Sequence, residues 1–197
     1  INDAHIHHNM NSGLSVVSAA LQSSRLLLEE NIGKIGCGGF LSGASLKLID
    51  SRVRKNKGLY GATWGESGGG ALWVHANSAL HLIDSKVTEN AAFHSAGIGV
   101  STGSRLVMER SSIKNNRPTN PNFNEPIWGE MTSSGGGVLL LEGHLTMLEG
   151  SEISHNYARF GAGVQVGAGS TLIGKSSFIG YNGRFISGAG AQIFLVG

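Results

Sequence analysis

A six-residue pattern, Ser-x-(Ile/Val)-x-x-Asn, recurs along the chain and restricts its possible folds more than any other feature. Clear copies begin at Ser51, Ser85, Ser111, Ser151 and Ser177. Two weaker copies without the serine end at Asn9 and Asn31. The shorter intervals between successive closing asparagines are 22 to 26 residues, and the longer ones are 34 and 40. This spacing indicates one repeated structural unit that carries insertions in some copies.

Two further segments recur within each unit. A short alternating segment such as LKL at 46–48 or LHL at 80–82 precedes the hexad, and a glycine-led apolar segment such as 69–74 lies upstream of it. Alternation with a period of two, bounded by Gly, Asn and Ser, is typical of strands, and no apolar stripe has helical spacing. Three short strands per unit predict an all-β fold, a parallel β-solenoid of about seven coils.

Stacking of the coils assigns side chains to the inside or the outside. The hexad Ile or Val positions should form one inward column and the leucines of the alternating segment a second. The first column is Ile6, Leu28, Val53, Val87, Ile113, Ile153 and Ile179, and the second is Leu21, Leu46, Leu80, Leu106 and Leu172. In one coil an extra residue separates Leu145 from Ser151, and we expect a β-bulge there.

The closing asparagines have a structural explanation. Asn tolerates a left-handed backbone at a sharp turn, and amides stacked at equal positions can form a hydrogen-bonded ladder. We therefore interpret these residues as scaffold: Asn31, Asn56, Asn90, Asn116, Asn156 and Asn182.

Outward residues of the hexads offer charge pairs between neighbouring coils. Glu29 should meet Arg54, and Glu30 should meet Lys55. Asp50 and Asp84 share one position in adjacent coils, with Arg110 next. These two carboxylates either repel each other mildly, with nearby basic residues relieving the repulsion, or form a cation site. The first interpretation is favoured because no third acidic residue reaches the column.

Composition narrows the function classes. The 197 residues include 31 Gly, are 40% hydrophobic and only 14% charged, and carry a net charge of +2. The apolar content argues against disorder, and the scattered basic residues give no footprint for nucleic acid. Cys37, the one cysteine, is expected to be a buried small hydrophobe. No apolar run is long enough for a membrane helix. Neither end of the sequence resembles a cap, so we expect residues 1–197 to be one β-helix segment of a longer chain.

Two insertions, 57–67 and 117–134, interrupt the repeat. Both contain Trp-Gly-Glu shortly before a run of glycines, and function on a solenoid usually lies on such insertions. We expect the two tryptophans on one face, two coils apart, where they could stack on sugar rings or dock a protein; alternatively, each covers its own loop. The candidate binding residues are Trp64, Glu66, Phe123, Trp128 and Glu130.

Metal binding and catalysis receive little support. His5 and His7 share an outward face and could bind zinc, but a solvated strand face is the preferred interpretation, and no metal site or cofactor is predicted. The other histidines are expected at scattered outward positions: His75, His81, His94, His144 and His155. Glu66 and Glu130 are the one carboxylate pair whose expected spacing is compatible with glycoside hydrolysis.

The glycine-led segment Gly69-Gly70-Ala71-Leu72, together with pairs such as Val53…Asn56 and Val87…Asn90, resembles the repeats of the polymorphic outer-membrane protein family of autotransporter adhesins. That family has Phe where this chain has Val or Ile. The resemblance implies a right-handed parallel β-helix with an adhesive role.

The sequence thus predicts a non-enzymatic extracellular or cell-surface β-helix that acts as a stalk and binding scaffold. Its partner would be a glycan or a surface protein held by the insertions. The alternatives are a carbohydrate-active β-helix enzyme and a fibre subunit that associates end to end.

Overall fold

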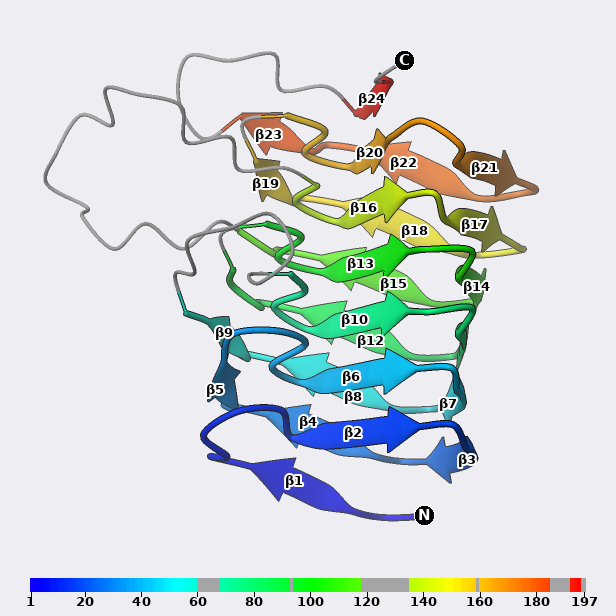
Figure 1. Ribbon diagram of the computed structural model, residues 1–197. Coiled ribbons are helices and arrows are strands. Elements are labelled where there is room, and N and C mark those ends of the chain that lie inside the picture. Colours follow the sequence, from blue (N-terminus) through cyan, green and yellow to red (C-terminus); the bar gives the residue numbers. More distant parts are fainter. Residues whose placement is uncertain (60–67, 93, 118–134, 159, 185–191, 196–197) are drawn as a thin grey trace, which may run out of the picture.

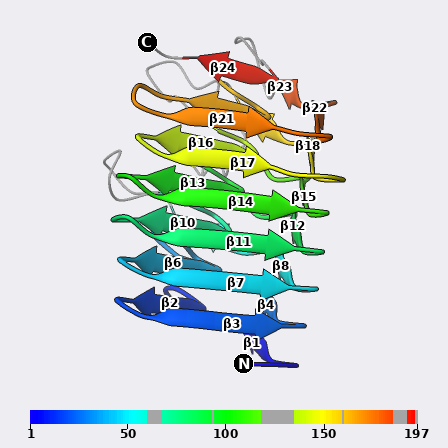
Figure 2. The same ribbon diagram turned by 90° about the vertical axis from the view of Figure 1, so that its right-hand side faces the viewer.

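The computed structural model describes residues 1–59, 68–92, 94–117, 135–158, 160–184 and 192–195. Within these ranges all regular secondary structure is β, and no helix there is long and apolar enough to cross a membrane. The strands stack into a column of coils with one three-sheet cross-section, as Figures 1 and 2 show from two sides. This architecture confirms the predicted all-β parallel β-helix.

Each complete coil contributes one strand to each of three parallel sheets. The hexad sheet contains β1 (His5–His7), β4 (Leu27–Glu29), β8 (Arg52–Arg54), β12 (Lys86–Thr88), β15 (Ser112–Lys114), β18 (Glu152–Ser154) and β22 (Phe178–Gly180). The glycine-led sheet contains β2 (Leu14–Val17), β6 (Gly39–Ser42), β10 (Leu72–His75), β13 (Ile98–Ser101), β16 (Val138–Leu141), β20 (Val164–Val166) and β24 (Ile193–Leu195). The leucine sheet contains β3 (Ala20–Ser24), β7 (Ser45–Ile49), β11 (Ala79–Ile83), β14 (Arg105–Glu109), β17 (His144–Met147) and β21 (Thr171–Gly174).

Two short pairs of strands extend the coils beyond the hexad sheet. They are β5 (Ile32–Gly33) with β9 (Lys57–Gly58), and β19 (Tyr157–Ala158) with β23 (Gly183–Arg184). Each of these strands directly follows a closing asparagine of a hexad. They therefore mark the edge of the column at which the two insertions begin.

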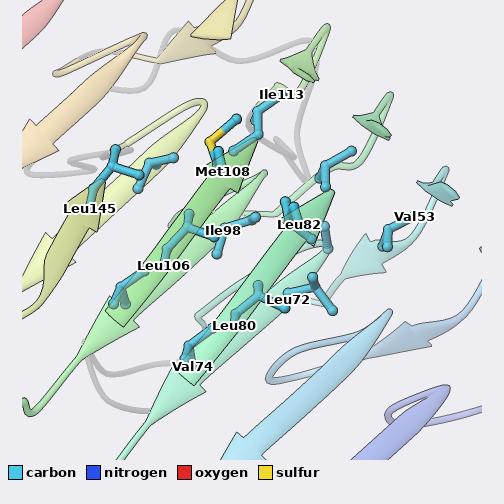
Figure 3. Close-up of a cluster of buried hydrophobic side chains, with 14 of the residues drawn as sticks. Val53, Leu72, Val74, Leu80, Leu82, Ile98, Leu106, Met108, Ile113 and Leu145 are labelled. Carbon is cyan, nitrogen blue, oxygen red and sulfur yellow. The ribbon is translucent and has the colours of Figure 1, made fainter. Parts of the chain in front are cut away.

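The strand register confirms both inward columns. Val53 pairs with Val87 and Val87 with Ile113, whereas Leu106 pairs with Leu80 on one side and Leu145 on the other. Because identical positions stack at the strand spacing of about 4.8 Å, similar side chains contact each other along the whole column. These residues form one continuous hydrophobic core, part of which is drawn in Figure 3.

The closing asparagines form a ladder through the described coils. Each side-chain amide donates to the side-chain oxygen of the asparagine in the next coil, from Asn9 up to Asn182, over 2.8 to 3.1 Å. The backbone N–H of each asparagine donates to the same oxygen. From Asn31 to Asn156 these residues are fully buried, so a missing bond could not be replaced by water.

The turn at the ladder differs from the sequence expectation in one respect. The left-handed residue is the one before each asparagine, with φ between 53° and 59°, and not the asparagine itself. The residues concerned are His8, Glu30, Lys55, Glu89, Asn115, His155 and Tyr181. The asparagine is conserved in position along the repeat because its amide fits the ladder, whereas the preceding residue carries the backbone strain.

The expected β-bulge near Leu145 is also wrong. β17 pairs with β14 in regular register from His144 to Met147. The extra residue lies in the turn that follows, where Gly150 has φ +69° and Ser151 N–H donates to the carbonyl of Leu148 over 3.1 Å. A glycine supplies the left-handed turn without a Cβ clash, so the corner absorbs the additional residue and the strand does not.

Candidate functional site

The five candidate binding residues of the insertions lie outside the described part of the chain. They are Trp64, Glu66, Phe123, Trp128 and Glu130. The structure does describe the chain on both sides of each insertion. The described part of the candidate site consists of those flanking segments and the neighbouring faces of the column.

Both insertions begin in one row of the column, two coils apart. Lys57 forms a parallel bridge with Ala91, and Ala91 forms one with Arg117. From the strand spacing, the Cα atoms of Lys57 and Arg117 lie about 10 Å apart along the axis. The row places the two starting points on the same edge, next to the hexad sheet.

The described residues after each insertion also occupy related positions. Gly68 bridges His94, and Gly135 N–H donates to the carbonyl of Phe160 over 3.0 Å. Gly69 and Gly135 both have a left-handed backbone, with φ of +70° and +61°. Each insertion thus returns to the column through a glycine turn, and each turn leads into a strand of the glycine-led sheet.

Trp73 is a residue of this region that the sequence did not single out. Its side chain points to the outside of β10 but is only 7% exposed. A Cβ at Gly99 in the next coil would come within 2.0 Å of the indole, and a Cβ at Gly68 within 2.5 Å. The indole therefore packs against two glycines, and the glycine at position 99 was the sequence signal for this contact.

His94 was expected at an outward position, and this expectation is wrong. Its residue surface is only 4% exposed, because it follows the hexad turn and enters the bridge with Gly68. Burial disfavours the charged imidazolium and lowers the pKa of His94 to about 4. The side chain is neutral at physiological pH and lies beside the return of the first insertion.

The outward side of the hexad sheet carries the predicted ion pairs. Arg54 Nε donates to Glu29 over 2.7 Å, and Lys55 lies 3.9 Å from Glu30. His5 bonds the second oxygen of Glu29 over 2.8 Å. Burial alone would raise the pKa of Glu29, but the hydrogen bond and charge of Arg54 outweigh it and the pKa lies below its usual value.

One more pair of this kind follows in the upper coils. Lys114 Nζ lies 2.5 Å from Glu152, whose other oxygen accepts from Ser154 over 2.6 Å. Burial would raise the pKa of Glu152, but the bonds from Lys114 and Ser154 lower it on balance. Charged side chains of this sheet therefore stabilise the stacking register, each pair by a few tenths of a kcal/mol.

Two of the three aspartates at the corner between the leucine and hexad sheets are also paired. Arg25 binds both oxygens of Asp3, and Arg110 binds both oxygens of Asp84 over 2.8 and 3.0 Å. These hydrogen bonds hold the pKa values of Asp3 and Asp84 below their usual range. Asp50 stands between Arg25 and Asp84 in this row. The arrangement favours the interpretation as relieved repulsion over a cation site.

Several basic residues differ from these because no described acidic residue pairs with them. Arg52 and Lys86 stand directly opposite each other on β8 and β12, and both are exposed. Lys57 and Arg117, at the starts of the insertions, are likewise exposed and unpaired within the described chain.

Cys37 and groups of metal-ligating side chains are the remaining candidates for reactive chemistry in the described part of the chain. Cys37 is fully buried, and desolvation raises the pKa of its thiol to about 11, which confirms the expectation of a buried small side chain. No group of three or more His, Cys, Asp or Glu residues there could hold a metal ion. The described carboxylates lie mainly in ion pairs.

Comparison with known families agrees with this architecture. A family model described as a right handed beta helix region matches residues 40–195. The match covers most of the chain, which therefore belongs to the right-handed β-helix family, and the predicted handedness is confirmed. No curated protein and no solved structure matches the chain.

Proposed function

We propose that this right-handed β-helix is a non-enzymatic binding scaffold, a rigid column that presents its two insertions to a glycan or a surface protein. The observation that carries the proposal is the row Lys57–Ala91–Arg117, which starts both insertions on one edge two coils apart. Two segments held at a fixed separation can contact one extended partner together, and the second contact then gains from a high effective concentration.

Rigidity of the column supports this role. The asparagine ladder and the continuous core leave little freedom between neighbouring coils, since each coil is bonded to the next on all three sheets. A scaffold of this kind loses little conformational entropy on binding, and this preorganisation favours affinity.

The distribution of carboxylates supports binding over catalysis. Asp3, Asp84, Glu29 and Glu152 each hold a basic partner, and the pKa of each lies below its usual value. A general acid needs a raised pKa near the working pH, which none of these residues has. Glu66 and Glu130, outside the described residues, are the remaining pair to test.

Adhesion at a cell surface is the biological setting that we propose. The Gly69-Gly70-Ala71-Leu72 segment and the hexads resemble repeats of the polymorphic outer-membrane protein adhesins. In that setting the chain would be an extracellular segment, and its insertions would contact the host or a neighbouring cell.

A printed panel of neutral polysaccharides tests the proposal with the labelled 197-residue chain. We expect selective retention by one glycan class, and loss of that retention in the Trp64→Ala/Trp128→Ala double variant. The matched control is the Trp73→Phe variant, which alters the tryptophan of the described column and leaves both insertion tryptophans in place. Circular dichroism should show an intact β-helix in all three proteins.

Three results would overturn the proposal. Unchanged retention in the double variant would exclude the insertions as the binding site. Release of sugars from a polysaccharide, abolished by Glu66→Gln or Glu130→Gln, would replace it with a carbohydrate-active enzyme. Concentration-dependent fibres without glycan retention would replace it with a self-assembling subunit.

A further inference from the structure

The outward side of the hexad sheet concentrates basic residues in its three middle coils, those of β8, β12 and β15, which lie at mid-height in the stack in Figure 2. Seven of the chain's 15 Lys and Arg residues belong to these hexads and the residues just after them. They are Arg52, Arg54, Lys55, Lys57, Lys86, Lys114 and Arg117. The same segments contain one acidic residue, Glu89, although the whole chain has a net charge of only +2.

Arg52 and Lys86 are the exception to the charge pairing along the column. They are direct partners in the parallel register of β8 and β12, so two positive side chains start about 4.8 Å apart. Their neighbours in the same row are Leu27 below and Ser112 above, neither of which is charged. Like charges directly opposite each other destabilise a sheet, whereas the pairs at Glu29–Arg54 and Lys114–Glu152 are complementary.

Flanking groups extend this positive region. Arg54 and Lys114 stand on either side of Thr88 in one row, and Arg54 contacts Glu29 through its Nε. A guanidinium has five donors, so its terminal nitrogens can still bind an anion. Thr88, Ser112 and Glu89 add oxygen atoms that can bond hydroxyl groups.

We propose that this basic face, the outward side of β8, β12 and β15 centred on Arg52 and Lys86, binds an acidic polysaccharide. A carboxylate or sulfate group would lie between Arg52 and Lys86 and remove their mutual repulsion, with the guanidinium donating two parallel bonds. Hydroxyl groups of the same chain would meet Thr88, Ser112 and Glu89.

Other polyanions fit the face less well. Protein interfaces usually bury an aromatic or apolar anchor, and none of the exposed large hydrophobic residues lies on β8, β12 or β15. Single-stranded nucleic acid needs aromatic platforms, which these strands also lack. Glu89, the one carboxylate among these basic residues, can accept hydrogen bonds from the hydroxyl groups of a glycan.

Isothermal titration with four probes tests the inference: dextran sulfate, oligogalacturonate, neutral dextran and oligo-dT. The first two distinguish sulfate from carboxylate as the recognised group. We expect binding of at least one acidic glycan, and a loss of at least about tenfold in affinity in the Arg52→Ser/Lys86→Ser variant. The control is Arg105→Ser/Lys175→Ser, which removes two exposed positive charges from the leucine-sheet side.

Binding that weakens about equally in both double variants would reduce the effect to net charge and overturn the inference. The same holds if neither acidic glycan binds, or if oligo-dT binds as tightly as they do. All four substituted residues are exposed, so the variants should fold, and thermal unfolding checks this. The inference is independent of the insertion tryptophans, so binding of the acidic glycan should persist in Trp64→Ala/Trp128→Ala. If this variant lost binding while Arg52→Ser/Lys86→Ser kept it, the inference would be contradicted.

Discussion

Gln192 takes the position of an asparagine above Asn182. Its Oε1 accepts bonds from the side-chain amide and the backbone N–H of Asn182 over 3.0 and 3.1 Å. Its Nε2 returns a bond to the carbonyl of Asn182 over 3.1 Å. In the lower coils these roles are divided between the next asparagine and the backbone N–H that follows it, as for Gly183 N–H bonding the carbonyl of Asn156. One glutamine side chain therefore completes the bonding of the last asparagine.

Substituting an asparagine in the buried middle of the ladder should cost much more stability than substituting one at its exposed end. In the Asn90→Ala variant the backbone N–H and the amide of Asn56 lose their acceptor, and Asn116 loses a donor, all in a dry interior. We expect a loss of about 3 kcal/mol or more in the free energy of unfolding, measured with urea.

Asn9→Ala is the matched control, because Asn9 is exposed and donates the same kind of bond to Asn31. Water can replace that bond, so we expect a loss of less than about 1 kcal/mol. Equal losses in the two variants would show that burial of the ladder does not set its contribution.

The repeat explains how much the sequence revealed. Val53, Leu80 and Asn90 could be placed correctly because each has equivalents in neighbouring coils, so one pattern fixes the position of many residues. The Glu29–Arg54 pair followed from the same register.

Features that occur once escaped the same reasoning. Three such features have no equivalent among the described residues of the other coils: the burial of His94, the contact of Trp73 with Gly99, and the bonds of Gln192 to Asn182. Each of these features depends on the size and position of one particular neighbouring residue. The two insertions have no counterpart in the neighbouring repeat units of the sequence, so their residues could be proposed as a site from composition and position alone.

The contact between Trp73 and Gly99 gives a prediction about packing. An alanine at position 99 would place its Cβ 2.0 Å from the indole, which must then move or tilt. We expect Gly99→Ala to lower the free energy of unfolding by about 1–3 kcal/mol. In a double-mutant cycle with Trp73→Leu, the Gly99→Ala cost should fall by at least about 1 kcal/mol, because the clash is gone.

Gly174→Ala serves as the reference for that cycle. Its nearest atom would be Ser177 Oγ at 3.0 Å, in an exposed strand, so its cost should not depend on Trp73. Additive losses for Gly99→Ala and Trp73→Leu would show that the two residues do not constrain each other.

Cys37 should be unreactive in the folded protein. Its thiol is fully buried, and its pKa of about 11 leaves little thiolate at neutral pH. We expect no reaction with a disulfide reagent such as DTNB at pH 8 over minutes, and one equivalent of reaction after unfolding in urea. Rapid labelling of the native protein would mean that this coil opens easily or that the thiol is accessible.

The pH dependence of stability should carry the signature of His94. Its pKa is about 4 in the folded protein, below the ordinary value of 6.5, because burial disfavours the charged form. Between these two values the unfolded chain binds a proton that the folded chain does not, so stability falls as the pH decreases from 6.5 towards 4. Above pH 6.5 His94 is mostly neutral in both the folded and the unfolded chain, so its titration no longer changes the stability. The free energy of unfolding can be measured by urea titration at several pH values across this range. Replacing His94 with Gln should reduce its slope against pH by the equivalent of about one proton.

Gly99→Ala is the control for this measurement, since it lowers stability without removing a titratable group and should keep the slope of the unmodified chain. Protonation of Glu29 and Glu152 also lowers the stability of the protein on acidification, because the pKa values of both are lowered in the folded state. This effect is the same in both variants. The difference between the two curves therefore isolates His94. Identical slopes for His94→Gln and Gly99→Ala would show that the imidazole titrates alike in the folded and unfolded chain, which its burial beside Gly68 argues against.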